Sequence, residues 1–187
     1  PDGQTVPIDF AIDGAGRCDI TMTWQGERAE VPELGLLFPL RRELTEVSYL
    51  GLGPRETTAD RTTGGKMGAW SYNVRQDFAR NTPVYPQECG SRTGVYSAAL
   101  TGRDTEVPGI RFASDDGMTF SALPYTPHEL ENARHLYELP RDDNKTVVRC
   151  AAFQRGVGGD NSWGATPHEA ACFAVEKGMT FSFSIQK

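Results

Sequence analysis

A glycine-rich segment near the carboxyl end, residues 156–164, has the residue types best suited to chemistry. Asp160, Asn161 and Ser162 precede Trp163, and four glycines surround them. Glycine brings no side chain to pack and loses much backbone entropy on ordering, so we expect a loop whose shape is held by contacts from outside. An indole beside short polar side chains suits the apolar face of a sugar. The alternative is a surface loop whose tryptophan packs back onto the protein.

Two other polar, turn-prone segments carry charged side chains at short spacing. The first contains Glu56, Asp60 and Arg61, and the second contains Glu88 and Arg92. Charged loop residues more often serve solubility and geometry than catalysis. We therefore interpret these five residues as a structural salt-bridge network, in which Glu88 and Arg92 pair with each other or with the first segment.

Spacing disfavours two further kinds of site. A phosphate-binding loop would need glycine in place of Asp60 and serine or threonine in place of Met67. His128 and His135 lie seven residues apart, with no third ligand at suitable spacing, so we expect no metal site in this chain. We expect no other cofactor here.

Length and composition predict one ordinary globular domain. The 187 residues can bury a sizeable core and show no composition break, so we interpret residues 1–187 as a single domain. The net charge of -6 and the lack of a basic run disfavour nucleic acid as a partner. No apolar run approaches the roughly 20 residues of a membrane helix, so no membrane partner is expected. The start at Pro1 is typical of a segment cut from a longer protein or of a processed start.

The cysteines are far apart and form no CxxC motif. They are Cys18, Cys89, Cys150 and Cys172. Free thiols in a cytoplasmic protein are the favoured interpretation, and disulfides stay possible.

Hydrophobic periodicity predicts an antiparallel β-protein with one short helix. Expected strands cover 6–10, 18–24, 34–40, 47–52, 70–74, 95–100, 109–112, 171–175 and 179–185, and residues 176–178 are expected to join the last two as a hairpin. The helix begins with a capping box from Thr126 to Glu129, and Leu130, Ala133, Leu136 and Tyr137 share one face of it. Pro140 closes that helix.

Several segments together resemble the C-terminal, or small-chain, domain of the large bacterial β-galactosidases of glycoside hydrolase family 2. They are Gly-Leu-Gly-Pro-Arg-Glu at 51–56 with Asp60 and Arg61, Tyr-Pro-Gln-Glu-Cys-Gly-Ser-Arg at 85–92, Phe-Ser-Ala-Leu-Pro-Tyr at 120–125, and Gly-Val-Gly-Gly-Asp at 156–160 with Ser-Trp-Gly at 162–164. They occur in the family's order and span the chain from about Leu36 to the end. The family's version of the domain has more sequence before Pro1, so this chain resembles a front-trimmed domain.

The resemblance implies an all-β, antiparallel β-supersandwich of the galactose mutarotase-like kind, packed on a (β/α)8 barrel. That barrel carries the two catalytic glutamates and the family's Mg and Na ions, and this chain has no counterpart of those glutamates. By position Trp163 resembles the tryptophan that stacks on the aglycone sugar, the glucose of lactose, with Asp160, Asn161 and Ser162 beside it. Gly156, Gly158 and Gly159 would shape the loop.

The expected function is therefore that of a non-catalytic domain that completes the aglycone subsite of a retaining β-galactosidase. Its partners would be the barrel domain or a large subunit, and galactosides such as lactose, in an oligomeric and cytoplasmic parent. One alternative is a stand-alone, weak carbohydrate-binding module. A remote alternative is acid–base chemistry on a sugar by Glu56, Glu88 or Asp160 with His128 or His168, although no motif links these residues.

Overall fold

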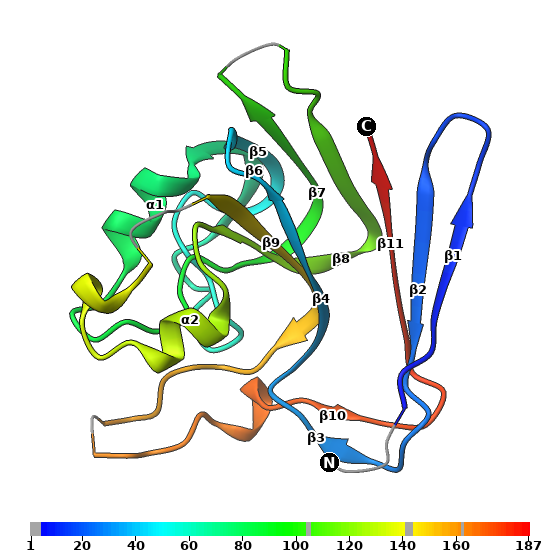
Figure 1. Ribbon diagram of the computed structural model, residues 1–187. Coiled ribbons are helices and arrows are strands. Elements are labelled where there is room, and N and C mark those ends of the chain that lie inside the picture. The colour runs from blue at the N-terminus through cyan, green and yellow to red at the C-terminus, as the bar shows by residue number, and fades with distance from the viewer. Residues whose placement is uncertain (1–4, 104–105, 141–143, 162) are drawn as a thin grey trace.

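The computed structural model describes residues 5–103, 106–140, 144–161 and 163–187, which fold into antiparallel β-structure with short helical segments along one side (Figure 1). In chain order the elements are β1 (Ile8–Ile12), β2 (Cys18–Thr23), β3 (Ala29–Glu30), β4 (Glu33–Arg41), β5 (Leu44–Gly53), β6 (Lys66–Asn73), α1 (Val74–Asn81), β7 (Arg92–Gly102), β8 (Ile110–Leu123), α2 (Pro127–Asn132), η1 (Leu136–Glu138), β9 (Lys145–Gln154), η2 (Glu169–Ala171), β10 (Ala174–Val175) and β11 (Thr180–Gln186). The expected class, all-β and antiparallel, is confirmed.

The long strand β8 joins the two parts of the main sheet. Over the described residues the strand order is β1-β2-β11-β8-β7-β5-β6, and β9 pairs with β8 and with β4. The first part of β8, around Phe112, pairs with β11 and β7, whereas residues 119–123 pair with β9, and β7 also pairs with β8 at Met118 and Phe120. This strand therefore carries the sheet from one layer into a second layer made by β9 and β4.

Aromatic side chains fill the space between these layers. Phe38 of β4 packs against Phe112 of β8 and Phe183 of β11, with ring centroids 5.5 and 5.9 Å apart. Phe112 and Phe183 are buried because alternate residues of a strand share one face. Burying each such side chain contributes about 1.5–3 kcal/mol, so this interior is a main source of stability.

Most predicted strands are confirmed. The β1–β2 hairpin, β4, β5, β7 and β11 lie where the alternation of apolar and polar residues places them. The helix that begins at Pro127 is also present, with the reciprocal Thr126 and Glu129 hydrogen bonds of a capping box. None of the helices within the described residues is long and apolar enough to span a membrane.

The predicted strand at 70–74 ends one residue early. Val74 begins α1, a helix that the sequence analysis did not anticipate, because the Asn73 side chain accepts the N–H groups of Arg75 and Gln76 and caps it. Val74 and Asp77 of this helix are buried. Because Trp70, Tyr72 and Val74 alternate as strand residues do, the sequence pattern did not show that the strand ends at Asn73.

The helix after Thr126 is shorter than predicted. It ends at Asn132, and Leu136 and Tyr137 lie in a separate 3-10 turn with exposed side chains. Leu130 and Ala133 are buried as expected, in a small cluster with Cys89, Leu123 and Leu139. The expected common face of four residues is therefore wrong for its second half.

The predicted hairpin around residues 176–178 is also wrong. Ala174–Val175 pairs with Ala29–Glu30 in a separate two-stranded sheet, and not with β11. Residues 169–171 form a 3-10 turn, so the strand expected over 171–175 is reduced to two residues. A turn does form, with the Met179 N–H bonded to the Glu176 carbonyl, but it leads to β11 from a strand that pairs elsewhere.

Candidate functional site

The glycine-rich segment is a loop that leaves β9 and projects to one side of the molecule (Figure 1). Trp163 lies in this loop with 92% of its surface exposed, so the indole does not pack back onto the protein. The Asn161 side-chain oxygen accepts the Trp163 backbone N–H at 2.8 Å, which fixes the local turn. Ser162 falls outside the described residues. The interpretation of Trp163 as a tryptophan packed on the sheet is therefore wrong.

Asp60 anchors this loop from a distant part of the sequence. Its carboxylate accepts the Gly158 N–H at 2.6 Å and the Thr58 hydroxyl at 2.6 Å. Burial raises the pKa of Asp60, but the hydrogen bonds from Thr58 and Gly158 outweigh burial and hold the pKa of this carboxyl below its usual value. The expectation that outside contacts shape the loop is confirmed.

Close approaches explain two of the glycines. A Cβ atom on Gly156 would lie 2.7 Å from the Asp60 Cγ atom, and one on Gly159 would lie 2.1 Å from the Ala165 carbonyl oxygen. Gly164 has φ of +93°, which side chains rarely tolerate. Gly158 is less constrained, since its Cβ would meet Asp60 at 3.4 Å. The loop thus has a defined shape.

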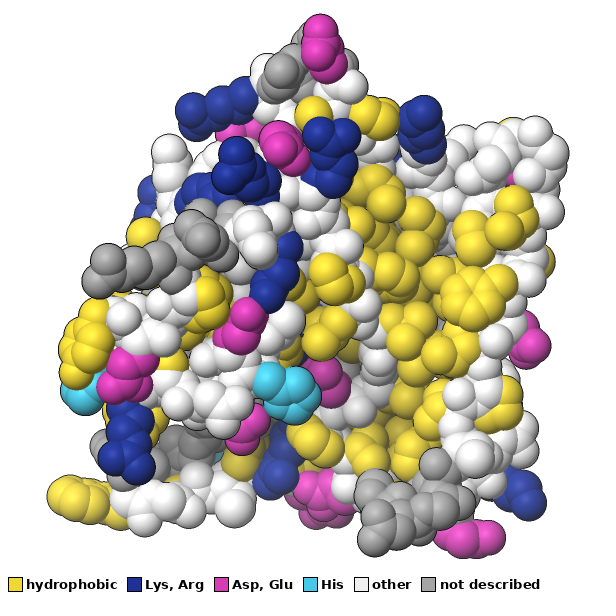
Figure 2. Space-filling view, viewed as in Figure 1, with side chains coloured by type: hydrophobic (Ala, Val, Ile, Leu, Met, Phe, Trp, Pro, Cys, Tyr) yellow, Lys and Arg dark blue, Asp and Glu magenta, His cyan; other side chains and the backbone are white. Residues whose placement is uncertain are grey.

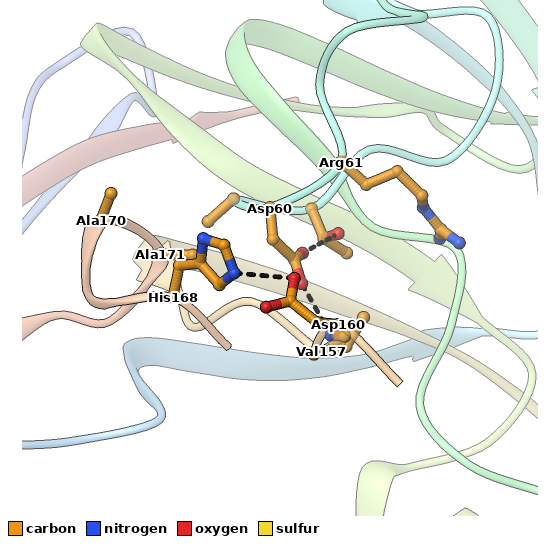
Figure 3. A pocket seen from close by; sticks show the side chains of 11 residues that line it. Asp60, Arg61, Val157, Asp160, His168, Ala170 and Ala171 are labelled. Atoms are coloured by element: carbon orange, nitrogen blue, oxygen red, sulfur yellow. Dashed lines mark hydrogen bonds and ion pairs between the residues drawn. The ribbon is translucent and has the colours of Figure 1, made fainter. Parts of the chain in front are cut away.

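A pocket of about 460 Å³ lies between the Asp60 segment, this loop and the η2 turn. Its lining residues are Thr58, Ala59, Asp60, Arg61, Val157, Gly158, Gly159, Asp160, His168, Ala170 and Ala171. Asp160 and His168 point toward one another across it, with Oδ1 and Nε2 2.8 Å apart (Figure 3). Both side chains are exposed. From the sequence alone, Asp160 and His168 were expected together only as a remote acid–base alternative.

Arg61 and Glu56 form one of the expected ion pairs. Glu56 also accepts the N–H of Gly90, so it ties the first charged segment to the second. The Arg61 side chain, which also lines the pocket, extends away from Asp60 and Asp160 (Figure 3).

Arg92 has a partner that the sequence analysis missed. Its guanidinium is buried and makes two hydrogen bonds to the Asp77 carboxylate, at 2.7 and 2.8 Å. It also lies over the Tyr72 ring, 4.3 Å from the ring centroid. Burial lowers the pKa of Arg92, but the hydrogen bonds and charge of Asp77 outweigh burial, so the pKa is raised. Once α1 is recognised, Asp77 is the acidic residue on its buried face.

Glu88 pairs with Arg149 of β9, and neither with Arg92 nor with the first charged segment, the two alternatives that the sequence left open. The Arg149 guanidinium is buried and also contacts Glu33 at 2.9 Å and the Ser91 hydroxyl at 2.9 Å. Burial lowers the pKa of Arg149, and the charge of Glu33 opposes that effect. Charged residues of both segments thus form ion pairs, but two of the partners lie on α1 and β9.

No cluster of three or more His, Cys, Asp or Glu side chains that could hold a metal ion occurs in the described part of the chain. The four cysteines are free thiols. An anchored loop with an exposed tryptophan, beside a pocket of about 460 Å³ lined by both polar and apolar residues, has the features of a binding surface of an antiparallel β-domain.

Comparison with known proteins identifies the family. Residues 1–185 match the family model described as the β-galactosidase small chain, and the protein belongs to that family. It is 35% identical over 182 residues to a β-galactosidase of Lactobacillus delbrueckii subsp. bulgaricus, covering 96% of this chain and 17% of the relative. It is 32% identical over 192 residues to a β-galactosidase small subunit of Latilactobacillus sakei, and the match covers 97% of this chain and 59% of that subunit.

Among solved structures, a galactose mutarotase-like protein from Lactobacillus casei is similar with a TM-score of 0.42 and 9% identity, covering 98% of this chain and 62% of that chain. The chain thus spans about a sixth of the full-length β-galactosidase from Lactobacillus delbrueckii and over half of the small subunit from Latilactobacillus sakei.

Proposed function

We propose that this chain is a non-catalytic domain of a retaining β-galactosidase of glycoside hydrolase family 2, and that it completes the aglycone subsite. The observation that supports this proposal is the 92% exposed Trp163 on a loop that Asp60 and the glycines hold in shape. Covering a large exposed aromatic side chain with a ligand or partner removes its apolar surface from water, which is favourable. The small-chain family gives that ligand a chemical class, a galactoside.

The geometry of the loop favours stacking on a sugar. The indole contributes a flat apolar face, and a loop already ordered before binding loses less conformational entropy than a flexible one. Asp160 and Asn161, which precede Trp163 in the same loop, carry carboxylate and amide groups of the kind that bind sugar hydroxyl groups. One stacked ring contributes only a few kcal/mol, so the chain alone should bind sugar with a Kd of about 1 mM or weaker.

In this proposal the catalytic carboxyl groups lie on a partner domain or subunit. Retention of configuration needs two carboxyl groups about 5 Å apart, one of them a nucleophile. Glu56 and Glu88, which the sequence analysis considered as acids, are held in ion pairs with Arg61 and Arg149. The catalytic glutamates and the Mg and Na ions are assigned to the barrel, on the remainder of the polypeptide or a large subunit.

Complementation tests this function. The chain is mixed with the matching large fragment or subunit, and hydrolysis of lactose and of an activated aryl galactoside is compared with that of each component alone. Lactose activity that appears only in the mixture supports the proposal. Full lactose activity of the large component alone would refute it.

The variant Trp163→Ala tests whether Trp163 contributes to binding of the aglycone sugar. In the complex, kcat/KM for lactose should fall roughly ten- to hundredfold, equivalent to about 1.4–2.8 kcal/mol. Hydrolysis of the aryl galactoside should change little, because its activated leaving group depends less on aglycone contacts. Tyr137→Ala is a matched control, since Tyr137 is an exposed aromatic side chain on another segment. Equal losses on both substrates would contradict the assignment of Trp163.

A second candidate, a stand-alone carbohydrate-binding module, is favoured by the 460 Å³ pocket beside the loop. Calorimetric titration of the isolated chain with lactose distinguishes the two. A Kd well below 1 mM would favour the module, since stacking on Trp163 alone cannot supply that affinity.

A further inference from the structure

Ser91 connects the two segments that meet at the tryptophan loop, residues 156–164. Its backbone carbonyl accepts the Thr57 N–H at 2.9 Å, three residues before Asp60. Its hydroxyl donates to the side-chain oxygen of Gln154, the last residue of β9, at 2.6 Å. Only 2% of the Ser91 surface is exposed, so a ligand at the loop would not reach it. The residue is therefore a candidate for positioning and not for binding.

The Ser91 hydroxyl group joins two side chains of β9. A serine hydroxyl has one hydrogen to donate, which Gln154 receives, and the Arg149 guanidinium donates to the same oxygen at 2.9 Å. On the face drawn in Figure 2 the Lys and Arg side chains lie at the surface, where solvent screens their charges, whereas the Arg149 side chain is only 2% exposed. Removing the Ser91 hydroxyl would leave a buried charged donor and a buried amide oxygen each short of one partner.

A β-bulge in β9 turns both of these side chains toward Ser91. Arg149 and Gln154 are five positions apart, so in a regular strand they would lie on opposite faces. The register of β9 against β4 shifts between them and passes over Ala152, which brings the two side chains to the same face. Glu33 of β4 lies opposite Gln154 and also contacts Arg149, as a shared face requires. Bulges often redirect a side chain next to a functional site, and Gln154 lies two residues before the loop.

The segment that carries Asp60 is fixed to the Ser91 segment through Thr57. The Thr57 hydroxyl accepts the Thr93 N–H at 2.9 Å and the Thr93 hydroxyl at 3.1 Å. Thr57 is 2% exposed, so these hydrogen bonds are shielded from water. A shift of the Asp60 segment relative to Ser91 would break them together with the bond to the Ser91 carbonyl.

The contact between Asp60 and the loop tolerates little displacement. The Gly158 N–H lies 2.6 Å from the Asp60 carboxylate, and a hydrogen bond weakens steeply once its geometry is lost (Figure 3). Gly156 lies so close to Asp60 that a Cβ atom on it would be 2.7 Å from the Asp60 Cγ atom. The two segments must therefore keep their separation. Ser91 bonds to one of them through its carbonyl and to the other through its hydroxyl.

We propose that Ser91 is a positioning residue for the aglycone subsite. It holds the Asp60 segment and the end of β9 at the separation at which Asp60 binds Gly158, and it thereby keeps Trp163 in place. The effect on catalysis rests on the proposed function, whereas the effect on the shape of the loop does not.

Hydrogen exchange of the Gly158 amide tests the positioning in the 187-residue chain. In Ser91→Ala this amide should exchange at least about fivefold faster, because the Asp60 carboxylate is less often within reach. Ser114→Ala is the matched control, since Ser114 of β8 is also buried and its hydroxyl donates to the Ser182 carbonyl at 3.0 Å. The control should leave the Gly158 rate unchanged. Equal acceleration by the two substitutions, or none by Ser91→Ala, would overturn the proposal.

A double substitution tests whether Ser91 acts through Asp60. In Asp60→Ala the Gly158 amide has lost its acceptor and should exchange fast. Adding Ser91→Ala should accelerate exchange no further, because the contact through which Ser91 acts is already gone. If the two effects multiply, Ser91 loosens the loop by another route and the proposal is wrong.

Gln154→Met provides a test that does not depend on the folding of Ser91→Ala. The substitution removes the acceptor of the Ser91 hydroxyl at nearly constant side-chain volume and leaves the Arg149 contact in place. The Gly158 amide should exchange at least about twofold faster. An unchanged rate would overturn the proposal, because it would show that the bond between Ser91 and β9 does not hold the loop.

Kinetics of the complex with the large fragment or subunit connect Ser91 to the subsite. Ser91→Ala should lower kcat/KM for lactose roughly three- to tenfold and change that for the aryl galactoside little. A lactose-selective loss in Trp163→Ala but not in Ser91→Ala would overturn the positioning role alone, as would equal losses on both substrates in Ser91→Ala. If Trp163→Ala shows no selective loss, the proposed function fails, and the Gly158 exchange rates still decide whether Ser91 positions the loop.

Discussion

Asp60 is the residue on which the shape of the tryptophan loop most depends. It lies about a hundred positions from the loop in sequence, and it reaches Gly158 through a turn closed by the Thr58 and Arg61 backbone groups. Sequence patterns identified Asp60 as part of a polar segment, but not as the anchor of a distant loop. Only the fold brings the two segments together, and no local spacing encodes that contact.

The lowered pKa of Asp60 predicts how the loop responds to acid. A carboxyl group whose pKa is lowered on folding stabilises the structure above its unfolded pKa of about 3.9, and that contribution is lost as pH falls through the lower folded value. The loop should therefore remain anchored from neutral pH to about pH 4 and loosen below it.

The Gly158 amide proton reports this transition in NMR spectra, because its shift depends on the charge of the acceptor. The shift should titrate with a midpoint below about 3.9 in the unmodified chain. In Asp60→Asn the shift should show no such titration, since the acceptor no longer ionises. A midpoint above the usual aspartate value would contradict the role assigned to the hydrogen bonds.

Among the helices and strands, α1 is an element that the sequence patterns did not predict. Alternating apolar residues correctly predicted β11 and the β1–β2 hairpin, because each has one buried face. The same alternation includes Val74, so it predicted strand where α1 begins. The signal for the helix start is the capping side chain of Asn73. Once the helix was missed, the buried partner of Arg92 was missed with it.

The Asp77–Arg92 pair should be a large contributor to how α1 is held against the sheet. Asp77→Ala leaves the Arg92 guanidinium buried without its carboxylate, and this should lower the free energy of unfolding by about 3–5 kcal/mol. Urea denaturation measures the change. Asp19→Ala, which removes an exposed pair with Arg17, is the control and should change the free energy of unfolding far less, because solvent screens that pair. Similar losses for both variants would show that burial of the pair is not what matters.

At the scale of the whole molecule, the family and the antiparallel class could be predicted from short motifs and periodicity, whereas the pocket could not. The pocket depends on three segments that meet only after folding, around Asp60, Asp160 and His168. The sequence also did not show that the sheet has an exposed apolar face, because Phe10 and Ile12 are residue types that strands commonly bury. Exposure, and not residue type, shows that the molecule has an uncovered face.

The contact between Asp160 and His168 raises the question of whether the chain by itself can act on a sugar. The two groups share a hydrogen bond beside a pocket of suitable size, which is the geometry of an acid–base pair. Both side chains are, however, at least 70% exposed, so water screens the interaction between them. We expect the isolated chain neither to hydrolyse galactosides nor to accelerate anomer interconversion.

Polarimetry of freshly dissolved α-galactose, with and without the chain, measures the second of these activities, and His168→Ala provides the matched control. Rates equal to buffer for both proteins would agree with a domain that binds and positions a sugar while the chemistry lies with its partner. Acceleration by the unmodified chain that disappears in His168→Ala would contradict this expectation, because it would make the pocket an active site. Acceleration that survives the substitution would also contradict it and would place the catalytic group elsewhere in the chain.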